Sequence, residues 1–208
     1  MNLLCFTFVV TRLKTLFRGR SEGNEQLTAI VATLLVPLLA IEGATLLNLR
    51  SLLTVHAFVG MLLIPVVALK LASTGWRMVR YYLHAEEYVQ RGPPHAVLRM
   101  LVAPVIVAST VVLFGTGVAL LAVDQTQGPI VGLHKASFVV WLGATSLHVL
   151  TRIPGMKRIL LRRLPGVTLR LGLAGGTLMA GLVLAMATLP AADHLQDTLS
   201  GSVGLDAR

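Results

Sequence analysis

The sequence has very little charge. Only 13% of its 208 residues are charged, nine of them acidic against eighteen lysines and arginines, whereas 55% are hydrophobic and the mean hydropathy is +0.77. Soluble globular domains carry about 25% charged residues. This composition therefore excludes an ordinary soluble domain and indicates an integral membrane protein.

Cysteine, aromatic residues and common catalytic motifs are also scarce. Cys5 is the only cysteine, which excludes an internal disulfide and a CxxCH site for covalent haem attachment. Aromatic residues make up 5% and are not interleaved with the basic residues, so the net charge of +9 indicates contact with lipid headgroups rather than with nucleic acid. No Walker loop, dinucleotide fingerprint, HExxH zinc site or nucleophile triad is present, so we expect any chemistry to belong to a non-covalently held cofactor.

Five apolar segments are each close to the roughly 20 residues that a membrane-spanning helix needs. We therefore predict an all-α membrane protein with five transmembrane helices, of which four form a bundle. Residues 1–26 are predicted to be a cytoplasmic, amphipathic N-terminal segment, 27–189 the membrane domain and 190–208 an extracytoplasmic tail. The first two segments are separated only by Arg50 and Ser51, which predicts an antiparallel hairpin. The predicted spans are Leu27 to Leu49, Leu52 to Trp76, Val97 to Val123, Pro129 to Ile153 and Val167 to Leu189.

The lysines and arginines are unevenly divided between the two ends of these segments. Clusters occur before the first segment, after the second and between the fourth and fifth, whereas the opposite ends have only Arg50, Lys135 and Arg208. By the positive-inside rule, the N-terminus is cytoplasmic and the C-terminus lies outside. We expect the chain to reside in a bacterial cytoplasmic membrane.

Three histidines in the predicted spans follow a regular spacing. His134 and His148 are fourteen residues apart on one helix, so they leave from nearly the same face, about 21 Å apart along the axis. Because the second and fourth helices run in the same direction, His56 and His134 lie at matched depth near the outer surface. Intramembrane histidines are costly unless partnered. Two imidazoles at one level on facing helices predict axial ligation of a haem b.

Lys70 follows His56 at the same spacing and is therefore level with His148. Three interpretations are open. Lys70 extends to the headgroups while His148 bonds to a neighbouring helix; or the pair holds a second haem, with a neutral lysine amine or His148 alone on the iron; or Lys70 stabilises a haem propionate or a quinone oxygen as a cation.

The pattern H-x13-H on one helix and H-x13-K on a parallel one resembles the di-haem cytochrome b of quinol-oxidising complexes and the four-helix b-type cytochromes that anchor formate dehydrogenases and nitrate reductases. The stretches NLRSLLTVHAFVGMLLIPVVALKLASTGWRMVRYY and LHKASFVVWLGATSLHVL look like a bacterial cytochrome b-like group that also has lysine at the second site. The resemblance covers roughly residues 24–152. It implies that each haem takes one ligand from each helix, His56 with His134, and His148 with position 70.

Other residues are candidates for holding the cofactor. Gly43, Gly60 and Gly117 could form grooves against a porphyrin, although glycine is common at any contact between membrane helices. Arg50 and Lys135 could meet haem propionates or lipid headgroups. Glu42 is a candidate for proton release from a quinol or for an ion pair with Arg50.

We therefore predict a membrane b-type cytochrome that transfers electrons between a quinone pool and a partner redox protein or acceptor. A catalytic activity of its own is left unassigned. The alternative is a haem-free transporter or assembly anchor in which the buried histidines and Lys70 form a proton or ion relay. The spectrum of the purified protein distinguishes the two.

Overall fold

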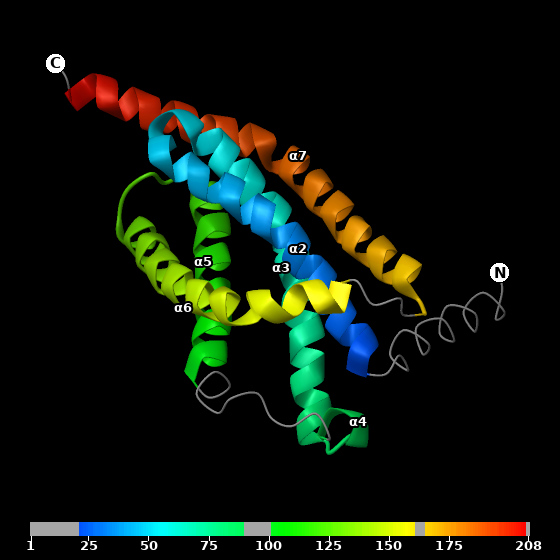
Figure 1. Ribbon diagram of the computed structural model, residues 1–208. Helices are drawn as coiled ribbons and strands as arrows, with labels where there is room; N and C mark the ends of the chain where they lie inside the picture. Colours follow the sequence, from blue (N-terminus) through cyan, green and yellow to red (C-terminus); the bar gives the residue numbers. More distant parts are fainter. Residues whose placement is uncertain (1–20, 90–100, 161–164, 207–208) are drawn as a thin grey trace.

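The computed structural model describes residues 21–89, 101–160 and 165–206, and all regular elements in these ranges are helices (Figure 1). The first twenty residues of the predicted amphipathic segment lie outside the described residues. The elements are α2 (Ser21–Thr45), the 3₁₀ helix η1 (Leu46–Asn48), α3 (Leu49–Tyr82), α4 (Glu86–Val89), α5 (Ala103–Val123), α6 (Pro129–Leu160) and α7 (Val167–Asp206).

Within the described ranges, four helical stretches are long and apolar enough to cross a membrane. They are Glu22–Tyr82, which contains both α2 and α3, then Ala103–Val123, Pro129–Leu150 and Val167–Ser200. Many large apolar side chains point outward, for example Val111, Val139 and Val183, each more than 60% exposed. A soluble monomer rarely exposes so much apolar surface. An apolar surface of this kind is stable in the hydrocarbon core of a bilayer, which is consistent with a multi-pass membrane protein.

The first apolar stretch folds back on itself. Asn48 leaves the helical conformation (φ −144°, ψ 62°) just before α3 begins. Further along, the Asn24 side-chain amide donates a hydrogen bond to the Ser73 carbonyl at 2.8 Å, and Lys70 Nζ donates to the Thr28 carbonyl at 2.8 Å. These pairs require α2 and α3 to run antiparallel, as the sequence predicted for a hairpin at this point.

α7 packs along α2 and α3, while α5 and α6 pair with each other on the other side (Figure 1). The buried core lies among α2, α3 and α7. Gly181 allows the closest approach, because a Cβ there would collide with the backbone carbonyl of Leu62. A space for a site lies between the group formed by α2, α3 and α7 and the pair formed by α5 and α6. The core residues are Val31, Leu35, Val59, Leu63, Val66 and Ala174.

Three helices continue past the predicted ends of their spans, and the first is α3, which continues to Tyr82. α6 continues to Leu160, and α7 continues through Pro190 to Asp206, into the region that we predicted to be a separate tail. Ala192 and Leu195 are 1% and 6% exposed, so the continuation of α7 buries an apolar face against the rest of the chain. Burial of this face stabilises helix beyond the proline.

Candidate functional site

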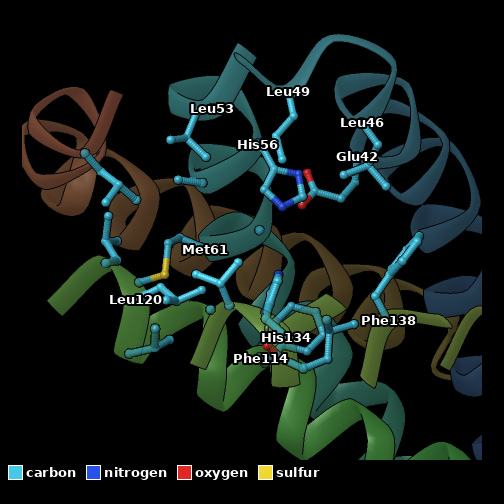
Figure 2. Close-up of a pocket in the computed structure, with 18 of the residues that line it drawn as sticks. Glu42, Leu46, Leu49, Leu53, His56, Met61, Phe114, Leu120, His134 and Phe138 are labelled. Atoms are coloured by element: carbon cyan, nitrogen blue, oxygen red, sulfur yellow. Dashed lines mark hydrogen bonds and ion pairs between the residues drawn. The ribbon is translucent and has the colours of Figure 1, made fainter. Parts of the chain in front are cut away.

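A cavity of about 340 Å³ lies between α2 and α3 on one side and α5 and α6 on the other. Most of its wall is apolar, with Leu49, Met61, Phe114 and Phe138 among the side chains around it (Figure 2). Cavities of this size and character are typical of cofactor sites. The polar and charged residues that line it are Glu42, Arg50, His56, Gln125, Thr126, His134 and Lys135.

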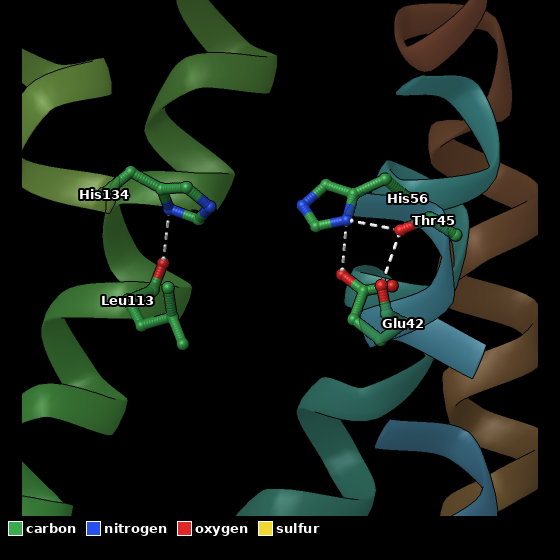
Figure 3. Close-up of polar contacts among 5 residues, drawn as sticks. All are labelled: Glu42, Thr45, His56, Leu113 and His134. Carbon is green, nitrogen blue, oxygen red and sulfur yellow. Dashed lines mark hydrogen bonds and ion pairs between the residues drawn. The ribbon is translucent and has the colours of Figure 1, made fainter. Parts of the chain in front are cut away.

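His56 of α3 and His134 of α6 face each other across this cavity. Their ring centroids are 6.4 Å apart, and the ring planes are nearly perpendicular, at 88°. In each ring, Nδ1 points back to its own side of the cavity, and Nε2 points toward the opposite ring (Figure 3). The structure therefore brings together the two histidines that the sequence placed at one depth.

The hydrogen bonds of His56 fix its tautomer. Nδ1 lies 3.0 Å from Glu42 Oε1, a carboxylate oxygen that only accepts, and 2.9 Å from Thr45 Oγ1. The Thr45 hydroxyl donates its one proton to the Glu42 carbonyl at 2.6 Å, so toward His56 it also accepts. In the neutral ring, Nδ1 therefore carries the proton that it donates to Glu42, and Nε2 is the nitrogen available to a metal ion.

The same reasoning applies to His134. Its Nδ1 lies 3.1 Å from the Leu113 carbonyl, which only accepts, and 3.0 Å from Thr116 Oγ1. The Thr116 hydroxyl donates to the Val112 carbonyl at 2.6 Å. Nδ1 of His134 is thus the donor, so in the neutral form of each ring Nε2 is the nitrogen available to a metal ion. Metal-ligating histidines are usually oriented in this way, by a partner on the other ring nitrogen.

This geometry fits an iron porphyrin. A metal–imidazole bond is about 2.0 Å, and a ring centroid lies about 1.1 Å behind its nitrogen, so two imidazoles on opposite sides of one metal have centroids about 6.2 Å apart. The observed separation is 6.4 Å. In the described parts of the chain, no three His, Cys, Asp or Glu side chains are grouped as a metal-ion site. Two facing imidazoles suffice for haem, because the porphyrin supplies four nitrogens.

Two of the predicted groove glycines line the cavity. A Cβ on Gly117 would lie 3.3 Å from His134 Cε1, and a Cβ on Gly60 would lie 3.5 Å from Glu42 Oε1. Gly60 therefore leaves room for the carboxylate, and Gly117 for the imidazole. Gly43 is exposed and does not belong to the lining, whereas Arg50 and Lys135 do.

The predicted inner pair lies away from the cavity. Neither Lys70 nor His148 belongs to its lining, and the Lys70 amine donates to the Thr28 carbonyl at 2.8 Å. Both side chains are half-buried. The structure thus gives the two predicted sites different surroundings, one with a cavity between its two residues and one in which the lysine bonds to the helix backbone.

The hydrogen-bond partners of the two histidines were not expected from the sequence. Glu42 was considered for a quinol or for Arg50, but the structure pairs it with His56. Thr45 and Thr116 were not singled out, because a threonine in an apolar helix most often bonds to its own backbone, as both of these also do. No signal in the sequence distinguishes these two from the other threonines.

The end of α7 covers one side of the cavity, to which it contributes Leu195 and Leu199. Gln196 holds it there, donating to the Arg50 carbonyl at 2.5 Å and accepting from the Leu53 amide at 3.0 Å. His194 lies 2.9 Å from Asp124 at the end of α5, and its side chain is 73% exposed.

The chain matches no protein-family model, and no match to it is found among curated proteins or solved structures, so the geometry of the site carries the functional argument.

Proposed function

We propose that the chain is a membrane b-type cytochrome in which His56 and His134 are the axial ligands of one haem b. The observation that supports this most directly is that the two Nε2 atoms face each other on rings whose centroids are 6.4 Å apart, while each Nδ1 has a hydrogen-bond acceptor on its own side. The haem supplies one-electron chemistry by cycling between ferric and ferrous iron. The protein then transfers electrons between a quinone pool and a partner redox protein or acceptor.

The other lining residues fit roles in holding this cofactor. Apolar side chains of α3 and α5 would pack against the bound cofactor and exclude water, which would limit side reactions. Arg50 and Lys135 are exposed at the cavity and are placed to pair with the propionates. Gly117 leaves room for the His134 imidazole, and Gly60 lies beside the Glu42 carboxylate that pairs with His56.

The proposal includes five membrane crossings, by α2, α3, α5, α6 and α7, in a bacterial cytoplasmic membrane. The antiparallel α2–α3 hairpin supports two crossings within the first apolar stretch. The distribution of lysine and arginine supports a cytoplasmic N-terminus. In this orientation the His56–His134 site lies near the outer surface, within reach of an extracytoplasmic acceptor.

The proposal assigns one haem. A second haem at His148 and Lys70 would need its own cavity, and neither residue lines the one described above. The hydrogen bond from Lys70 to Thr28 supports a structural role that holds α2 against α3.

A proton relay in a haem-free protein is the second candidate. The Glu42–His56 contact at 3.0 Å supports it, because a carboxylate and an imidazole at this distance can exchange a proton.

The purified protein distinguishes the candidates. We expect a dithionite-reduced spectrum with Soret and α bands and a pyridine haemochrome value of one haem per chain. The double variant His56→Ala/His134→Ala should lose the haem, and the control His148→Ala should retain it. Absence of haem from the wild type, or its retention in the double variant, would refute the proposal.

A further inference from the structure

The two facing imidazoles have chemically different partners. Nδ1 of His56 donates to a carboxylate, Glu42 Oε1, at 3.0 Å. Nδ1 of His134 donates to a neutral backbone carbonyl, that of Leu113, at 3.1 Å. Each ring also has a threonine hydroxyl within 3.0 Å of Nδ1. The carboxylate is therefore the principal difference between the two sides.

The surroundings of Glu42 strengthen its contact with His56. The two side chains are 18% and 20% exposed. Within the part of the chain that the structure describes, Glu42 Oε2 is buried and has no hydrogen-bond partner. Because little water reaches the Glu42 carboxylate, its hydrogen bond with His56 Nδ1 is stronger than the same bond would be in water.

A carboxylate on Nδ1–H increases the basicity of the imidazole at Nε2. A more basic axial nitrogen donates more electron density to iron, which stabilises the ferric state relative to the ferrous state. Second-shell hydrogen bonding is one of the means by which proteins set haem potentials. A neutral carbonyl, as on His134, has a smaller effect.

We propose that Glu42 is a positioning residue that makes His56 the stronger of the two axial donors and thereby lowers the midpoint potential of the site. This inference rests on the proposed function. It assigns to Glu42 a role in setting the direction of electron flow, because a lower potential makes the site a better donor.

The test compares three variants by redox titration at one fixed pH. In Glu42→Gln, the amide oxygen can still accept from Nδ1 but has no charge. We expect haem to remain at one per chain and the ferrous/ferric ratio at a given potential to rise at least tenfold, which is a shift of about 59 mV for a one-electron couple. Glu42→Asp retains the charge and should shift the potential less. His148→Ala, a control whose side chain lies outside the cavity lining, should retain the haem and leave the potential close to that of the wild type.

A second measurement does not depend on haem binding. In protein with ¹⁵N-labelled histidine, the wild type should show His56 protonated at Nδ1, with a proton resonance shifted downfield by the carboxylate, and Glu42→Gln should reduce that shift. If haem is present but Glu42→Gln leaves both the potential and this resonance unchanged, the role of Glu42 is refuted and the cytochrome proposal stands. If the wild type binds no haem, the proposed function fails and with it the assignment of a potential, whatever the resonance shows.

Discussion

Replacing either axial histidine by alanine should leave a void that free imidazole can fill, and the two voids should differ in affinity. In His56→Ala, a bound imidazole can donate its N–H to Glu42 Oε1 and Thr45 Oγ1, the acceptors 3.0 and 2.9 Å from Nδ1 of the native ring. In His134→Ala, the corresponding acceptors are the Leu113 carbonyl and Thr116 Oγ1, at 3.1 and 3.0 Å, and both are neutral.

The difference in affinity follows from the type of hydrogen bond. A hydrogen bond to a charged group contributes about 1.5–3 kcal/mol, and one between neutral groups about 0.5–1.5 kcal/mol. The dissociation constant for imidazole should therefore be lower in His56→Ala by about 1 kcal/mol, which is about fivefold.

An optical titration measures this directly, because each variant should change from five-coordinate to six-coordinate low-spin haem as imidazole binds. His148→Ala is the control, and it should be six-coordinate without added imidazole. Equal dissociation constants, or tighter binding by His134→Ala, would contradict the role given to the carboxylate. A six-coordinate spectrum in either variant without imidazole would contradict the ligand assignment itself.

Three further predictions concern other parts of the molecule. The ferric wild type should give a single large-g feature in its low-spin EPR spectrum, because the ring planes are at 88°, whereas parallel planes would give three resolved g values. Gly181→Leu should lower the midpoint temperature of thermal unfolding in detergent, because the new side chain would meet the Leu62 backbone and overpacking costs about 1–3 kcal/mol. The control is Gly172→Leu, at a glycine with open space around it. Equal midpoint temperatures for the two variants would refute the close crossing of α3 and α7. Lys70→Met should leave the haem content at one per chain in the pyridine haemochrome assay, because Lys70 lies outside the cavity lining, and loss of the haem would show that Lys70 takes part in binding it.

The sequence predicted the helices and the matched depth of His56 and His134, because both follow from local patterns. A run of apolar residues determines a helix in a membrane irrespective of its neighbours. The distribution of lysine and arginine then orients the helices, and counting residues from a helix end gives the depth of each histidine. The orientation of the helices and the depth of each histidine can both be predicted without knowing the distance between helices.

The partners of the histidines could not be predicted in this way. The contact of Glu42 with His56 depends on how α2 is rotated against α3, and that rotation is set by packing around Val31, Leu35 and Leu63. The extension of α7 was missed for a similar reason. The composition of residues 190–208 is less apolar, and Pro190 favours a helix end, but burial of Ala192 and Leu195 against the rest of the chain outweighs both.

The inner pair shows the limit of spacing alone. The spacing of fourteen residues places His148 and Lys70 about 21 Å from His134 and His56 along the helix axes, and neither residue lines the cavity. Equal spacing on two helices also gives no information about the separation of those helices at the second level. The predicted inner pair therefore shares a depth without sharing the cavity.

The position of α7 bears on the order of assembly. α2, α3, α5 and α6 surround the cavity, and all of them precede α7 in the chain. Because synthesis proceeds from the N-terminus, the four cavity helices emerge from the ribosome while the side later covered by Leu195 and Leu199 is still open. The haem that we propose would have access to its site during this interval, and the hydrogen bonds of Gln196 would then hold the end of α7 over it.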